Sequence, residues 1–124
     1  MSETAQSDYP LVVIQTPPYS SSVARGALDV ALSLAVFNQH PLVLFSGPGV
    51  RCLAQSQNPQ AIERKSLAKI IDSFGLYDIE SVFVDQTSLT THGMTPDELP
   101  AYTQLLDNRG VQQLCSAAAQ ILSF

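Results

Sequence analysis

Short apolar runs alternate with stretches of helical periodicity along most of this chain. Residues 11–14 and 41–45 are apolar runs with β-branched side chains, a pattern typical of strands that are buried on both faces. Between them, apolar residues recur at helical spacing from Val23 to Phe37, and we expect this stripe to face inward. Strand, helix and strand in this order predict the βαβ crossover from which parallel sheets are built.

The same alternation continues to the end of the chain. The elements predicted next are, in order, a short helix over 50–54, a helix from residue 59 or 61 to 74 that stops at Gly75, a strand over 79–84, a short helix capped by Thr87 or Ser88 and ending near Gly93, a helical turn capped by Thr95, a strand over 102–106, a helix over 110–118 and a strand over 120–124. This alternation predicts an α/β fold, in which helices cover both faces of a mainly parallel sheet.

Length and composition favour a single domain that associates with another subunit. The chain has 124 residues, of which 45% are apolar and 14% are charged, whereas about a quarter is charged in an average protein. We expect residues 1–9, which are polar and acidic, to form a flexible tail and residues 10–124 to form a single domain. The low charge content predicts apolar surface outside the core, which in most proteins marks a subunit interface.

Several classes of function are disfavoured by the charge and by the apolar pattern. The net charge is −5 and the six Lys and Arg residues are dispersed, so direct nucleic-acid binding is not expected. No apolar run reaches the roughly 18 residues that span a membrane, and the start of the chain is not a secretory signal. A cytoplasmic location follows as the expectation. The two cysteines lack the spacing of a redox pair or a zinc site, so we expect no metal and no cofactor.

Two loops expected at the carboxyl ends of the strands are candidates for binding an anion. Ser20, Ser21 and Ser22 open the helix after the first strand, and Gly47 and Gly49 follow the second strand. Backbone N–H groups at such places can hold an anion. Simple helix capping is the alternative for the serines, because their loop lacks the glycines that let a phosphate come close.

A third loop carries polar residues after the third strand. Asp85, Gln86 and Ser88 are candidates for an interface or for a strand-end site. Asp85 can either cap the following helix or present its carboxylate to a partner, and we favour the cap. His40 and His92 are expected at the surface.

The chain contains two thiols, which are the groups that sulfur chemistry needs. Cys52 follows Gly-x-Gly within the expected first turn of a helix, where the helix dipole favours a reactive thiolate. The alternative is that Cys52 packs as a small apolar side chain, as free cysteines usually do. Cys115 is expected to be structural.

Seven stretches of the sequence form an ordered set that spans nearly everything after the first nine residues. They are TPPYSS (16–21), ARGALD (24–29), FSGPGV (45–50), QNPQAI (57–62), LYDIE (76–80), SLTTHGM (88–94) and ILSF (121–124). This set resembles the small sulfur-relay proteins of the DsrE/DsrF-like family, and within it the TusC/DsrF branch. The resemblance implies a five-stranded sheet in a flavodoxin-like, three-layer arrangement.

The resemblance also implies partners. Such a subunit joins DsrE/TusD-like and DsrH/TusB-like chains in a hetero-oligomer, which relays sulfur toward tRNA 2-thiouridine or serves sulfur oxidation. In the family, the cysteine that carries the persulfide belongs mainly to the DsrE/TusD-like chain and lies just after the third strand. The corresponding residues here, 84–88, contain no cysteine. We therefore expect a non-catalytic subunit of a sulfurtransferase complex.

Two other hypotheses stay open at this point. One is a thiol sulfurtransferase that itself carries persulfide on Cys52. The other is a homo-oligomeric protein that binds a small anion or a nucleotide through the loops after the first two strands. A homo-oligomer is also an alternative state of the isolated subunit.

Overall fold

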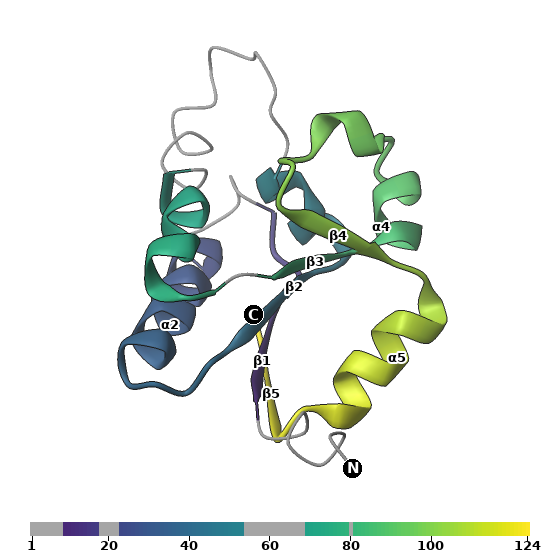
Figure 1. Cartoon of the computed structure of the whole chain (residues 1–124). Coiled ribbons are helices and arrows are strands. Elements are labelled where there is room, and N and C mark those ends of the chain that lie inside the picture. Colours follow the sequence, from purple (N-terminus) through teal and green to yellow (C-terminus); the bar gives the residue numbers. More distant parts are fainter. Residues whose placement is uncertain (1–8, 18–22, 54–68, 80) are drawn as a thin grey trace.

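Five strands lie side by side in one sheet, in the order β4-β3-β2-β1-β5, and every neighbouring pair is parallel (Figure 1). The computed structural model describes residues 9–17, 23–53, 69–79 and 81–124. The strands are β1 (Pro10–Ile14), β2 (Leu42–Phe45), β3 (Val82–Asp85), β4 (Thr103–Leu106) and β5 (Gln120–Ser123). The predicted parallel α/β fold is therefore confirmed. The expected tail over residues 1–9 falls almost wholly outside the described residues.

Helices cover the two faces of the sheet unequally. One face carries α2 (Val23–Val36), α4 (Gln86–Thr91) and the 3₁₀ helices η1 (Gly47–Leu53) and η2 (Ser73–Tyr77), and η3 (Pro96–Glu98) leads into β4. The other face carries α5 (Asn108–Ala117), which runs from the β4 edge of the sheet to the β5 edge. In Figure 1, α2 and η2 lie on the left of the sheet and α5 lies at the lower right.

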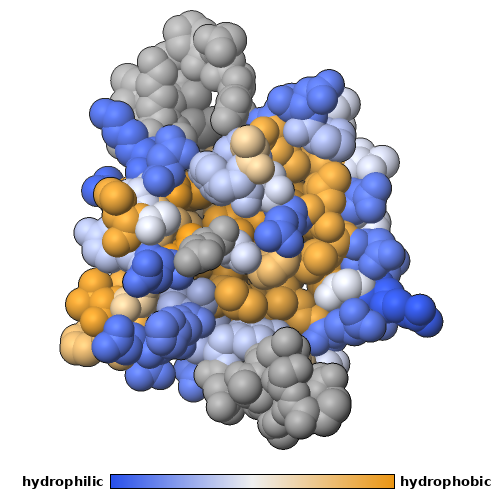
Figure 2. All heavy atoms as spheres, viewed as in Figure 1, coloured by the Kyte–Doolittle hydropathy of each residue, from blue (hydrophilic) through white to orange (hydrophobic). Residues whose placement is uncertain are grey.

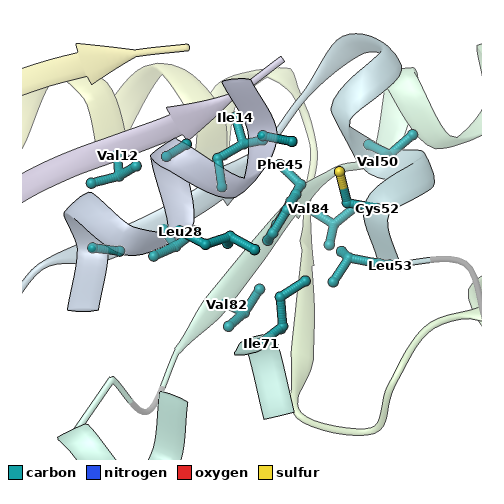
Figure 3. Packing of buried hydrophobic residues seen from close by; sticks show 14 of the residues in the cluster. Val12, Ile14, Leu28, Phe45, Val50, Cys52, Leu53, Ile71, Val82 and Val84 are labelled. Carbon is teal, nitrogen blue, oxygen red and sulfur yellow. The ribbon is translucent and has the colours of Figure 1, made fainter. Parts of the chain in front are cut away.

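The core is correspondingly asymmetric. Side chains that alternate along β1, β2 and β3 join α2, η1 and η2 in the larger cluster, part of which is shown in Figure 3. On the α5 face, the buried residues among those described are Leu11, Val13 and Leu44, while Leu42 and Phe83 stay half-buried. Figure 2 shows apolar atoms gathered at the centre of the face that Figure 1 presents. Among the described residues, one sheet face is thus densely packed and the other is only partly covered.

The inward stripe of α2 differs from the predicted one. Val23 and Phe37 were expected to face inward, but they are 42% and 74% exposed. The buried side of the helix is made of small residues and one leucine: Ala24, Ala27, Leu28 and Ala31. Because alanine side chains are short, the helix packs closely on β1, and the larger apolar residues lie on its sides. The prediction of a helix was right, and Ala27 and Leu28 of the predicted stripe are buried, but the inward orientation expected for Val23 and Phe37 was wrong.

Two other predicted boundaries are corrected. The helix expected to stop at Gly75 continues as η2 to Tyr77, while its predicted start lies outside the described residues. The third strand begins at Val82 and not at residue 79. Ile79 lies in the turn before β3 but is only 3% exposed. A buried apolar residue at this place extends the apolar pattern of the strand, which explains the early start that was predicted.

The end of η2 is closed by a left-handed residue. Asp78 has φ +65°, its N–H donates to Gly75 O at 3.3 Å, and the N–H of Ile79 donates to Phe74 O at 3.0 Å. This is the Schellman pattern, in which glycine is the usual residue because it has no Cβ to crowd the left-handed backbone.

Replacing Asp78 with glycine is therefore expected to stabilise the protein by about 1 kcal/mol. The side chain of Asp78 is exposed, so its removal costs little. Urea unfolding of the wild type and the Asp78→Gly variant measures the change. Asp29→Gly, in the middle of α2, is the matched control and is expected to lose about 1 kcal/mol. Equal losses in both variants would contradict the strain assigned to Asp78.

Two tyrosines make the stability of the fold sensitive to high pH. The hydroxyl of Tyr102 donates to Asp72 Oδ1 at 2.8 Å, and that of Tyr9 donates to Leu114 O at 2.6 Å. Burial raises the pKa of Tyr102, and the hydrogen bond and charge of Asp72 raise it further. Burial also raises the pKa of Tyr9, with a further contribution from Cys115.

Because both pKa values are raised, the folded state holds these protons more tightly than the unfolded chain, whose tyrosines ionise near pH 10. The free energy of unfolding is therefore expected to fall as the pH rises above about 10. Urea unfolding at about pH 8 and about pH 10.5 gives this loss. The double variant Tyr9→Phe and Tyr102→Phe is expected to lose less between the two pH values than the wild type. An identical loss in both proteins would show that these hydroxyls do not cause it.

Candidate functional site

The carboxyl ends of β2 and β3 bring a small polar cluster together. Gly47 N–H donates to Ser88 Oγ at 2.8 Å, and Ser88 Oγ donates to Asp85 Oδ2 at 2.9 Å. Ser46 Oγ donates to the same carboxylate oxygen at 3.3 Å. Because β2 pairs with β3 in parallel, the loops that follow these strands start next to each other. The cluster joins the two loops.

Asp85 is the centre of this cluster and the cap of α4. Its backbone is extended, with φ −72° and ψ 113°, and its Oδ1 accepts the N–H of Thr87 at 3.1 Å. The predicted cap by Asp85 is therefore confirmed, whereas the cap expected from Thr87 or Ser88 was wrong, because both residues lie inside α4. Both carboxylate oxygens are engaged within the subunit, so capping and joining loops are the roles that the geometry assigns to Asp85. A contact between Asp85 and a partner stays a prediction.

Of the two serines in the cluster, the sequence predicts Ser88 as a site residue but not Ser46. Ser88, a predicted site residue, is 9% exposed, and its hydroxyl both accepts and donates a hydrogen bond. Ser46 was not predicted, although its place directly after an apolar strand is a usable signal. Gln86 is exposed and does not join the cluster.

The two glycines after β2 serve the packing of the loop. Gly47 has φ +54°, which favours glycine. A Cβ on Gly49 would lie 2.0 Å from Ile14 O, so η1 approaches the end of β1 closely. The N–H of Gly47 donates to Ser88 and that of Gly49 donates to Ser46 O at 3.0 Å. Neither N–H is left for an anion, and the serines at 20–22 lie outside the described residues.

Cys52 lies in the core and not in the first turn of a helix. Because η1 begins at Gly47 and ends at Leu53, Cys52 stands in its last turn, where the dipole disfavours a thiolate. Its side chain is 2% exposed and lies among Val50, Leu53 and Val84 (Figure 3). Its Sγ donates to Thr16 O at 3.6 Å. These contacts support the alternative in which Cys52 packs as a small apolar residue.

The remaining candidates have simple environments. Cys115 is half-buried on α5 and packs against the smaller cluster. Arg51 Nε donates to His92 Nδ1 at 3.4 Å and so links η1 to the end of α4. His40 is exposed and has φ +52°. These contacts give the histidines and Cys115 structural surroundings.

An open groove of about 530 Å³ lies between α4 and the start of α5. We call it the α4–α5 groove, and its lining residues are Gln86, Thr87, Thr90, Thr91, Asp107, Asn108 and Arg109. Both helices begin at the carboxyl ends of neighbouring strands, β3 and β4. Sequence reasoning missed this groove because its two walls are distant in the chain and meet only through the pairing of β3 with β4.

The part of the chain that the structure describes contains neither a metal site nor a membrane-spanning helix. No group of three His, Cys, Asp or Glu residues there is placed to hold a metal ion. No helix within the same ranges has the length and apolar character that crossing a membrane requires.

The features above define a class of protein. It is a three-layer α/β protein with hydroxyl and carboxylate groups at the carboxyl end of its parallel sheet. The thiol of Cys52, which lies nearby, is buried in the core. The chain belongs to the DsrE/DsrF-like family, whose model matches residues 10–124.

Curated relatives match most of the chain. It is 34% identical over 112 residues to the "Protein TusC homolog" of Vibrio vulnificus, covering 90% of this chain and 95% of that protein. It is 31% identical over 84 residues to Protein TusC of Escherichia coli, covering 68% and 71%. The "Intracellular sulfur oxidation protein DsrF" of Allochromatium vinosum is 35% identical over 82 residues, which cover 66% of this chain and 60% of that protein.

A solved structure has the same fold. The ychN protein of Escherichia coli superposes with a TM-score of 0.75 over 94% of this chain and 99% of that chain, at 17% sequence identity. At this identity the likeness concerns the fold alone.

Proposed function

We propose that this chain is a non-catalytic subunit of a sulfur-relay complex, in which a DsrE/TusD-like chain carries the sulfur and a DsrH/TusB-like chain completes the assembly. The observation that carries this proposal is the composition of the segment after β3. Residues 84–88 contain no cysteine, and Asp85 and Ser88 in this segment are engaged in hydrogen bonds within the subunit. Relay chemistry needs a thiolate, so a partner supplies it.

The surface supports a subunit that is covered by others. Val36 and Phe37, at the end of α2, are 61% and 74% exposed, and Leu76 on the neighbouring η2 is 85% exposed. Figure 2 shows apolar atoms along the edge where these elements lie, and a second apolar area over the partly covered sheet face. Exposed apolar groups collected in this way are typical of interfaces.

The destination of the sulfur is either tRNA 2-thiouridine or the oxidation of sulfur. Relatives named for TusC and for DsrF both match this chain, and the choice depends on the partners. We place the complex in the cytoplasm, where tRNA is modified.

Co-purification tests the proposal. The tagged chain, expressed with the DsrE/TusD-like and DsrH/TusB-like proteins of its own organism, is expected to retain both through size-exclusion chromatography. Light scattering then gives the mass of the assembly. A chain that elutes as a monomer, with both partners folded and present, contradicts the proposal.

The Cys52 hypothesis gives a separate prediction. Because Cys52 is buried in an apolar cluster, incubation of the folded chain with a sulfur donor is expected to leave it without an adduct of about 32 Da in mass spectrometry. The complex that contains Cys52→Ala is expected to relay sulfur at the wild-type rate. The partner's cysteine, replaced by serine, is the positive control for loss of relay. An adduct on Cys52, together with loss of relay in Cys52→Ala, would make this chain the carrier.

A further inference from the structure

The α4–α5 groove is a preformed polar surface at the carboxyl end of the sheet. Figure 1 shows α4 and the start of α5 on the same side of the molecule, where β3 and β4 end. In parallel α/β proteins, binding sites lie beyond this end of the sheet. The volume of about 530 Å³ suits a loop of a few residues or a small ligand.

The walls of the groove are held by their own hydrogen bonds. Thr87 Oγ1 donates to Asn108 Oδ1 at 3.1 Å and so ties α4 to α5. Thr90 and Thr91 donate their hydroxyl protons to carbonyl oxygens one turn earlier in α4, at 3.3 and 2.9 Å. Their hydroxyl protons are therefore used, and the wall needs little rearrangement before it binds.

Arg109 is the cation in the lining of the groove. Its side chain is exposed, and within the described ranges its guanidinium makes no ion pair or hydrogen bond. Asp107 also lines the groove, but its Oδ1 accepts the N–H of Gly110 at 2.8 Å as the cap of α5. Asp107 keeps its negative charge, so the lining as a whole is not cationic, and the Arg109 guanidinium with its several N–H donors is the group there that can bind an anion.

We propose that the α4–α5 groove receives the sulfur-carrying loop of the partner subunit, with the Arg109 guanidinium facing the persulfide anion. This inference rests on the proposed function, in which the sulfur comes from another chain. A persulfide is a stronger acid than a thiol and is anionic at neutral pH. A weakly hydrated guanidinium is a suitable counter-ion for such a large, polarisable anion.

Cysteine cross-linking tests where the partner's loop lies. Thr90→Cys, inside the groove, is co-expressed with the DsrE/TusD-like partner, and the purified complex is treated with a mild oxidant. If the partner's loop lies in the groove, a disulfide between position 90 and the partner's sulfur-carrying cysteine is expected. A disulfide forms only when the two Cα atoms come within about 7 Å, so it reports that the loop is there. Ser116→Cys, exposed farther along α5, is the matched control and is expected to stay unlinked. Mass spectrometry identifies the linked peptides.

Removal of the positive charge at position 109 tests whether the guanidinium pairs with the persulfide anion. Arg109→Gln is expected to weaken the affinity for the persulfide-loaded partner about tenfold, which is the effect of one charged hydrogen bond. Arg25→Gln, exposed on α2, removes the same charge from the opposite side of the sheet and is expected to bind like the wild type. Binding is measured by titration with the loaded partner and with the partner whose cysteine is replaced by serine.

The possible failures can be told apart. If the complex forms with wild-type affinity while position 90 stays unlinked and Arg109→Gln has no effect, the groove is not the docking site, although the proposed function stands. If the wild-type chain binds no partner, the proposed function and this inference both fall.

Discussion

The Gly49→Ala variant is expected to lose about 3 kcal/mol of stability. The new methyl group would lie 2.0 Å from the carbonyl oxygen of Ile14 and 2.7 Å from its carbonyl carbon. Both atoms belong to the backbone of β1, which is paired with β2 on one side and β5 on the other. Because β1 is held by strands on both sides, η1 must move and take the loop after β2 with it.

Gly26→Ala is the control for this substitution. Nothing lies within 4 Å of a Cβ built on Gly26, which stands inside α2. The same added methyl is therefore expected to stabilise the protein by about 0.5 to 1 kcal/mol. Urea unfolding of both variants gives opposite signs if the close approach of Gly49 is real. A loss below about 1 kcal/mol at Gly49 would show that η1 adjusts freely.

The Asp85→Ala variant is expected to lose about 2 to 3 kcal/mol. The substitution removes the cap of α4 and the acceptor of the hydroxyl protons of Ser46 and Ser88. Ser88 is nearly buried, and a buried hydroxyl without its partner carries most of this cost. The loops after β2 and β3 then lose the contact that joins them.

A double-mutant cycle separates the two roles of Asp85. Ser88→Ala alone leaves the cap in place, so the loss in the double variant is expected to be at least 0.5 kcal/mol smaller than the two single losses together. Asp29→Ala, exposed on α2, is expected to change stability by less than about 0.5 kcal/mol. Strict additivity between Asp85 and Ser88 would contradict the coupling seen in the structure.

The apolar pattern of the chain predicts most of the architecture. The runs that become β1 and β2 are buried along nearly their whole length, so their apolar character is continuous and easy to identify. The cap of α4 by Asp85 was also predicted, because a carboxylate directly after a strand is a local signal. Local chemistry and the succession of strands and helices along the chain were thus accessible without coordinates.

Features that depend on neighbours in space were not accessible in the same way. The inward face of α2 depends on how closely its alanines approach β1. The place of Cys52 depends on the start of η1 at Gly47 and on the close approach of Gly49 to Ile14. The α4–α5 groove depends on the pairing of β3 with β4. Each of these contacts joins residues that no local pattern connects.

The pairing of β1 with β5 has a consequence for the biosynthesis of the protein. Pro10 is opposite Gln120 and Val13 is opposite Ser123, so β1 obtains its second neighbour only when β5, the last of the five described strands, has been synthesised. Until then one edge of an almost wholly apolar strand is open, and contacts of such long sequence separation form slowly. The nascent subunit is therefore expected to need a chaperone or rapid assembly with its partner subunits. Co-expression with these partners is expected to raise the yield of folded protein.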